Sequence, residues 1–235
     1  MEVRLHEAAA NQLSHEEFLE LIVNDELAVR SDRAIARRIK AAKFRELRSI
    51  EDFNFSFNPS IKQRVVMELA TCRFVREQKD ILLIGPPGVG KSHLAQALGH
   101  QAARMGYAVL YRSIFDAVGE FMEAEAFNES AKTLRKYLRP DLLIIDDMGL
   151  KKLPKQSGEH LFEIIMRRYE LRSTIMTSNR PLEEWGKLIG DVPTSTAILD
   201  RFLSRAELIQ ITGKSYRLKD KACKPKAEND KKKDK

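Results

Sequence analysis

The chain has 235 residues, and 43% of them are hydrophobic, which suffices for a buried core and excludes a chain disordered throughout. Its 41 Lys and Arg residues outnumber 34 Asp and Glu residues, giving a formal net charge of +7. The charge is unevenly distributed along the chain. Residues 214–235 hold ten bases and four acids, residues 29–48 hold eight bases and two acids, and residues 1–28 hold one base and seven acids. The net charge alone is therefore weak evidence for a nucleic-acid partner.

Neither a membrane segment nor a structural metal is predicted. No apolar run approaches the ~18 residues that a transmembrane helix needs, and residues 1–17 lack the apolar stretch of a signal peptide. Cys72 and Cys223 offer neither a disulfide framework nor paired metal-ligand spacing. We expect a cytosolic protein with no membrane partner.

The N-terminal part is predicted to be helical. Ser14 and Glu17 have the spacing of a capping box, so a first helix is expected to follow Ser14. A second helix is expected over about residues 31–47, where apolar residues recur at helical spacing and bases fill much of the rest. Pro59 disfavours helix before it, and Ser60 can cap a new one. We place a domain boundary there.

From residue 60 onward, helical and strand-like segments alternate. Helices are expected from 91, between 114 and 139, and over 159–169, with short apolar strands at 81–84, 108–111, 142–145, 174–177 and 208–211. Such strands are covered on both faces, so the pattern predicts an α/β fold in which helices sandwich a parallel sheet. The expected domains are a small all-helical one at 1–58, the α/β domain at 59–218, and a disordered Lys-rich tail at 219–235.

The segment from Gly85 to Ser92 matches the phosphate-loop pattern G-x-x-x-x-G-K-[ST], directly between a predicted strand and a predicted helix. Its glycines let backbone N–H groups curl around phosphates at a helix N-terminus. Lys91 is expected to reach the β- and γ-phosphates of ATP, and Ser92 to hold Mg²⁺. A simple Gly-Pro turn is the alternative. The nucleotide-binding set is Gly85, Pro86, Pro87, Gly88, Val89, Gly90, Lys91, Ser92 and His93.

Polar residues follow two other predicted strands, at the sheet edge where ligands bind. Asp146 is expected to orient Mg²⁺, and Asp147 to polarise the attacking water. Asn179 could hydrogen-bond the γ-phosphate or that water, or instead cap the turn before Pro181. Arg201, with Arg205 one turn on, is a solvated side chain or a group that reaches a neighbouring subunit's nucleotide, an effect worth about 10³ to 10⁵ in rate.

In this order the motifs resemble the AAA+ ATPases of the IstB/DnaC type. The segments that carry the resemblance are GPPGVGKS, LLIIDDMG, STIMTSN and ILDRF. Four further segments resemble IstB specifically, the ATP-dependent helper of an insertion-sequence transposase. They are ELATC, which ends at Cys72, RPD, which ends at Asp141, the Glu184–Trp185 pair, and the closing GKSYR. The resemblance covers about residues 1–218.

The resemblance implies an AAA+ core that self-assembles on duplex DNA with ATP, deforms that DNA, and recruits and stimulates the transposase of the same element. It implies that Lys91 and Ser92 are the phosphate-loop pair, that Asp146 and Asp147 are the magnesium and catalytic acids, that Asn179 is the sensor, and that Arg201 acts across subunits. Asp147 stands where many relatives have Glu, and its shorter reach suggests slow hydrolysis suited to a switch. Little chain remains after Arg201 for a helical lid.

The basic block supports a DNA partner without the resemblance, because a helix of about twenty residues spans roughly 30 Å and could make several phosphate contacts. A solvated helix neutralised by the acidic block is the alternative. Phe44 is the one aromatic residue among the bases at 29–48, which favours duplex over single-stranded DNA. The candidate DNA contacts are Arg33, Arg37, Arg38, Lys40, Lys43, Arg45, Lys132, Arg135 and Lys136.

Two other functions compete with this one. A DnaC-like loader of a replicative helicase would use its N-terminal domain to grip a protein, and the density of Arg and Lys in the second helix favours DNA instead. A small-molecule phosphotransferase would have no use for basic segments beside its core, nor for Asn179 and Arg201 in the roles given above.

Overall fold

The computed structural model of the chain describes residues 2–150, 153–154, 157–189 and 192–216. The predicted tail at 219–235 lies outside these residues.

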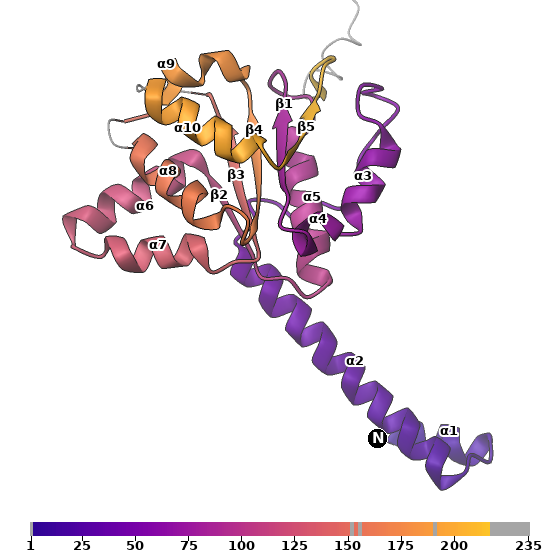
Figure 1. Cartoon of the computed structure of the whole chain (residues 1–235). Coiled ribbons are helices and arrows are strands. Elements are labelled where there is room, and N and C mark those ends of the chain that lie inside the picture. The colour runs from indigo at the N-terminus through magenta and orange to yellow at the C-terminus, as the bar shows by residue number, and fades with distance from the viewer. Residues whose placement is uncertain (1, 151–152, 155–156, 190–191, 217–235) are drawn as a thin grey trace, which may run out of the picture.

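Five parallel strands form one sheet, and the predicted α/β fold is confirmed (Figure 1). The strands are β1 (Asp80–Ile84), β2 (Val109–Ser113), β3 (Leu142–Met148), β4 (Ser173–Ser178) and β5 (Ala206–Gln210), in the order β2-β3-β4-β1-β5. All four neighbouring pairs are parallel. The first four strands are buried almost throughout, as continuously apolar segments require, whereas β5 is an edge strand and is partly exposed.

Helices cover both faces of the sheet. One face packs against α3 (Gln63–Ala70), α4 (Arg73–Arg76) and α5 (Lys91–Arg104). The other carries α6 (Ile114–Ala126), α7 (Ser130–Leu138), α8 (Ser157–Arg168), a 3₁₀ turn η1 (Leu182–Glu184), α9 (Trp185–Ile189) and α10 (Val192–Leu203). Side chains alternate between the two cores, with Ile81 and Leu83 in one and Leu82 in the other. Within the described residues, β5 alone follows α10, which leaves no helical lid there.

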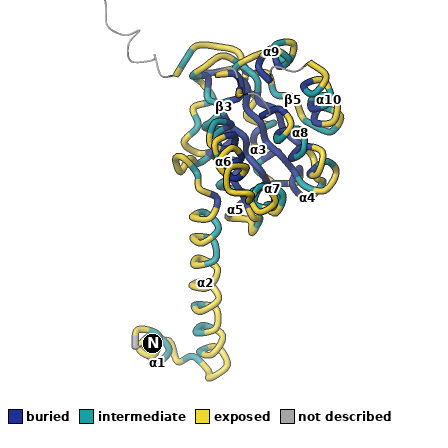
Figure 2. The backbone as a smooth tube through the Cα atoms, turned by 90° about the vertical axis from the view of Figure 1, so that its left-hand side faces the viewer, coloured by how far each residue is buried: buried dark blue, intermediate teal, exposed yellow. Residues whose placement is uncertain are grey.

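Two N-terminal helices form a hairpin that projects from the core: α1 (Glu2–Ala10) and α2 (His15–Ala42) (Figures 1 and 2). The predicted capping box is confirmed, because Ser14 Oγ accepts from the Glu17 N–H and the Glu17 carboxylate accepts from the Ser14 N–H at 2.7 Å. The prediction of two separate helices after Ser14 is wrong. The intervening residues contain neither Gly nor Pro, so one helix of 28 residues continues through them.

The segment between α2 and α3 lies against the α/β core rather than apart from it. Ile50 and Ile61 are buried, and Phe53 and Phe55 pack against the same cluster. Ser60 does not cap α3 as predicted, since the helix begins at Gln63 without a side-chain cap. The Ser60 hydroxyl instead accepts from the Thr212 N–H at 3.1 Å and ties this segment to the chain after β5. The domain limits at 58 and 218 stay predictions.

Candidate active site

The loop between β1 and α5 has the backbone that a phosphate-binding loop needs. Gly88 and Gly90 have φ values of +83° and +107°, which L side chains rarely adopt. A Cβ atom on Gly85 would lie 2.0 Å from the Ile211 carbonyl oxygen, and one on Gly88 would lie 2.1 Å from Ser215 Oγ. The loop therefore requires glycine both for its conformation and for the close approach of the chain that follows β5.

Lys91 and Asn179, predicted from separate motifs, are in direct contact. Lys91 Nζ donates to Asn179 Oδ1 at 2.6 Å and to the carbonyl oxygens of Gly85 and Pro86 at 2.7 and 2.8 Å. The turn before Pro181 is capped by Ser178, whose hydroxyl accepts from the Arg180 N–H at 3.1 Å. Asn179 is thus directed to the phosphate loop rather than to the turn.

Asp146 is almost fully buried and accepts three side-chain hydrogen bonds. Ser92 Oγ donates to its Oδ1 at 2.9 Å, Tyr111 donates to its Oδ2 at 2.6 Å, and the Thr177 hydroxyl also donates to Oδ1. Burial and the charge of Asp146 raise the pKa of Tyr111, so the phenol keeps its proton and remains a donor. The hydroxyl and carboxylate oxygens of Ser92 and Asp146 are ligands that suit Mg²⁺.

Tyr111 and Thr177 were not predicted as site residues. Both occupy the ends of predicted strands, at 108–111 and 174–177, and this position at the sheet edge is the signal that also marks Asp146 and Asn179.

Asp147 has a left-handed backbone with φ +65°, where the register between β3 and β4 shifts. Such a conformation is uncommon outside glycine, although Asp tolerates it better than most residues. Its N–H donates to Thr177 Oγ1 at 3.0 Å, and its carboxylate lies 3.6 Å from Arg45 Nη1. The side chain faces a cleft that is also lined by Lys43, Arg45, Tyr111, Arg112, Ser113, Phe115, Asp116, Gly119, Glu120 and Leu150.

His93, expected at the nucleotide, contacts the segment before α3. Its Nε2 lies 3.1 Å from the Ser49 carbonyl oxygen, and its ring meets Phe53 edge-on at 5.2 Å between centroids. Phe53 is also the residue that a Cβ on Gly90 would meet, at 2.8 Å. The rings of Phe53 and His93 therefore pack together beside the phosphate loop.

The two arginines predicted at the end of the fold differ in their surroundings. Arg201 is about half exposed on α10 and pairs with the adjacent Asp200 at 2.7 Å. Arg205 donates to the Glu77 carbonyl oxygen at 3.2 Å and lies 3.5 Å from the Glu170 carboxylate. Arg201 is the more accessible to another subunit.

The predicted DNA contacts divide between two surfaces. Arg33, Arg37 and Lys40 follow the helical spacing of one face of α2 and are exposed, whereas Arg38 is half-buried. Lys43 is the C-cap of α2, and Arg45 lies beside Asp147. On α7, Lys132 pairs with Glu129 at 3.1 Å and Lys136 with Glu120 at 2.6 Å, while Arg135 is exposed.

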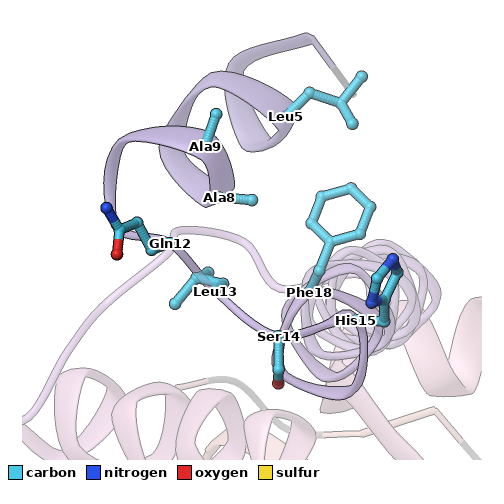
Figure 3. Close-up of a pocket in the computed structure, with 8 residues that line it drawn as sticks. All are labelled: Leu5, Ala8, Ala9, Gln12, Leu13, Ser14, His15 and Phe18. Carbon is cyan, nitrogen blue, oxygen red and sulfur yellow. The ribbon is translucent and has the colours of Figure 1, made fainter.

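A second hollow lies between α1 and α2 at the tip of the hairpin, away from the phosphate loop (Figure 3). Leu5, Ala8, Ala9, Leu13 and Phe18 give it an apolar lining. Gln12, Ser14 and His15 complete the lining, and the set contains no Lys or Arg to bind phosphate.

Comparison with known proteins identifies a family and its relatives. The family model for IstB-like ATP-binding proteins matches residues 1–224. The ATP-binding protein of insertion sequence IS5376 from Geobacillus stearothermophilus is 36% identical over 223 residues, which cover 95% of this chain and 89% of the relative. That of insertion sequence IS21 from Pseudomonas aeruginosa is 37% identical over 221 residues, covering 94% and 83%.

Solved structures with the same core include replication proteins. AMPPCP-bound DnaA from Aquifex aeolicus is 25% identical with a TM-score of 0.61, over 72% of this chain but about half, 51%, of DnaA. The DnaC helicase loader is 25% identical with a TM-score of 0.55, over 66% of this chain and 91% of the loader. No helix in the described ranges is both long and apolar enough to cross a membrane. The chain belongs to the family of IstB-like ATP-binding proteins.

Proposed function

We propose that the chain is a DNA-binding ATPase of the bacterial cytosol that regulates insertion-sequence transposition. It assembles on duplex target DNA with ATP, deforms that DNA, and recruits and stimulates the transposase of the same element. The observation that carries the proposal is the meeting of Lys91, Asp146 and Asn179 at one sheet edge, beside the end of a basic helix. The insertion-sequence relatives support the transposase as partner.

ATP is held by the phosphate loop. Lys91 donates to the carbonyl oxygens of the loop and to Asn179. When ATP binds, Lys91 would donate to β- and γ-phosphate oxygens instead. Ser92 and Asp146 would hold Mg²⁺, with Tyr111 and Thr177 orienting the carboxylate. When bound, the ion neutralises charge on the β- and γ-oxygens.

Hydrolysis requires a water in line with the bond between the γ-phosphorus and its bridging oxygen. Asp147 accepts a hydrogen bond from that water, and Asn179 orients the water or the γ-phosphate. The water oxygen forms the new bond to phosphorus as the bridging bond breaks, releasing ADP and phosphate. Arg201 of an adjacent copy stabilises the charge of the transition state. The short reach of Asp147 makes the reaction slow, which suits a switch.

Duplex DNA is contacted by the exposed face of α2. Arg33, Arg37 and Lys40 recur on one side of a helix of 28 residues, about 42 Å long at 1.5 Å per residue. Each phosphate that they neutralise adds about −0.9 to the slope of log affinity against log salt.

A DnaC-like helicase loader is the second candidate, favoured by the likeness to the DnaC structure over 91% of that chain. Electron microscopy of the protein with ATP and a plain duplex, compared with ATP alone, separates the two. A transposition regulator of the proposed kind forms ordered oligomers on the duplex. Oligomers that ignore the duplex and form on a replicative helicase would favour the loader.

A further inference from the structure

The junction between the basic helix and the α/β core contacts Asp147 directly and Asp146 through Tyr111. Helix α2 ends at Ala42, and Lys43 has a left-handed backbone, with φ 56° and ψ 44°, which turns the chain back toward the core. Of the next two residues, Phe44 packs beside Tyr111, which donates to Asp146, and Arg45 lies beside Asp147.

Phe44 packs beside Tyr111, the residue that donates to Asp146. Its ring centroid lies 6.3 Å from that of Tyr111, whose hydroxyl donates to Asp146 at 2.6 Å. The packing is tight, because a Cβ on Gly99 would lie 2.9 Å from the Phe44 ring and 2.5 Å from Ile144. Phe44 therefore connects the base of helix α2 to the side chain that donates to Asp146.

Arg45 faces Asp147 directly. Its Nη1 lies 3.6 Å from the carboxylate, and its side chain is 69% exposed at the margin of the cleft. Arg112, which lines the same cleft, is held by Glu120 at 2.8 Å and by the Tyr111 carbonyl oxygen at 2.7 Å. Arg45 is thus the more exposed of the two, and it follows closely on the end of the helix that offers its bases to phosphate.

We propose that Arg45 is a DNA-responsive positioning residue, which restrains the Asp147 carboxylate until duplex phosphates withdraw the guanidinium. A carboxylate paired with Arg45 is turned away from the attacking water, and one released by DNA can accept its hydrogen bond. Binding of DNA along α2 thereby raises the rate of ATP hydrolysis. The inference rests on the proposed function, since it assigns the coupling between the two sites.

The test measures steady-state ATP hydrolysis by Arg45→Ala, with and without a plain duplex. An exposed ion pair contributes about 0.2 to 1 kcal/mol, so kcat without DNA should rise about 1.4- to five-fold while KM for ATP stays the same. DNA should then stimulate the variant less than the wild type. Arg45→Lys keeps the charge and should stay near the wild type. Arg48→Ala, which removes an exposed arginine paired with Glu46, is the matched control and should show wild-type basal rate and stimulation.

An Arg45→Ala basal rate equal to or below that of the wild type would overturn the proposal, as would undiminished stimulation by DNA. Failure of the proposed function has a different signature. If a fluorescent duplex is not bound at all, DNA binding is wrong, but a raised basal rate in Arg45→Ala still supports the restraint on Asp147.

Discussion

Removing the Tyr111 hydroxyl should weaken the magnesium site without touching a ligand of the ion. In Tyr111→Phe, Asp146 loses one of its three side-chain donors and keeps Ser92 and Thr177. Hydrogen bonds to charged groups contribute about 1.5 to 3 kcal/mol, and loss of a group that orients a metal ligand typically costs 10- to 100-fold in metal affinity. The Mg²⁺ concentration for half-maximal ATP hydrolysis should therefore rise about 10-fold.

The assay is a Mg²⁺ titration of ATP hydrolysis at fixed ATP. Tyr137→Phe is the matched control, because Tyr137 is equally buried and donates to a carboxylate, that of Glu120, at 2.7 Å. Both variants should lose similar thermal stability, but Tyr137→Phe should keep the wild-type Mg²⁺ dependence. If Tyr111→Phe and Tyr137→Phe need the same Mg²⁺ concentration for half-maximal hydrolysis, Tyr111 does not orient the Asp146 carboxylate for Mg²⁺.

Three further predictions address DNA, the neighbouring subunit and stability. Arg33→Glu with Arg37→Glu should weaken duplex binding and flatten its salt slope by about 2; fluorescence anisotropy at several salt concentrations checks this, and an unchanged slope would place the DNA site elsewhere. Arg201→Ala should retain ATP binding but lower hydrolysis by at least about 10³-fold in the oligomer; normal hydrolysis would redirect attention to Arg205. Burial, opposed in part by the Thr174 N–H and by Arg168, raises the pKa of Asp80 to about 7 from 3.8. The pKa of Asp80 is higher in the folded than in the unfolded state, so protonated Asp80 stabilises the fold. This contribution to the free energy of unfolding is complete below about pH 4 and is lost as pH rises through about 7. The loss is roughly 4 kcal/mol, at 1.36 kcal/mol per pKa unit. Asp80→Asn should flatten this decline in chemical denaturation, and an unchanged pH profile would contradict the assignment.

The sequence predicted the elements whose signals are local. The five strands are short apolar segments between turns, and the phosphate loop has a fixed spacing of glycines with Lys91 and Ser92. The meeting of Lys91 and Asn179 followed from the rule that parallel strands end at one sheet edge.

The parts that were missed depend on contacts between distant segments. Arg45 reaches Asp147 across about a hundred residues, and nothing near Arg45 in the sequence indicates that partner. Helix α1 was not predicted, and it is held on α2 by the pair between Arg4 and Asp25 at 2.7 Å. The continuity of α2 was missed because apolar residues near its two ends have different neighbours: Phe18 lies beside α1, and Ile39 packs against the core.

Lys91→Ala tests whether bound ATP controls assembly on DNA. Wild type and variant are mixed with ATP and a plain duplex, and the size of the DNA-bound species is measured by sedimentation. The wild type should form ATP-dependent oligomers on the duplex, and a folded Lys91→Ala should form none. Equal ATP-stimulated assembly by the variant would show that assembly does not depend on nucleotide held by Lys91.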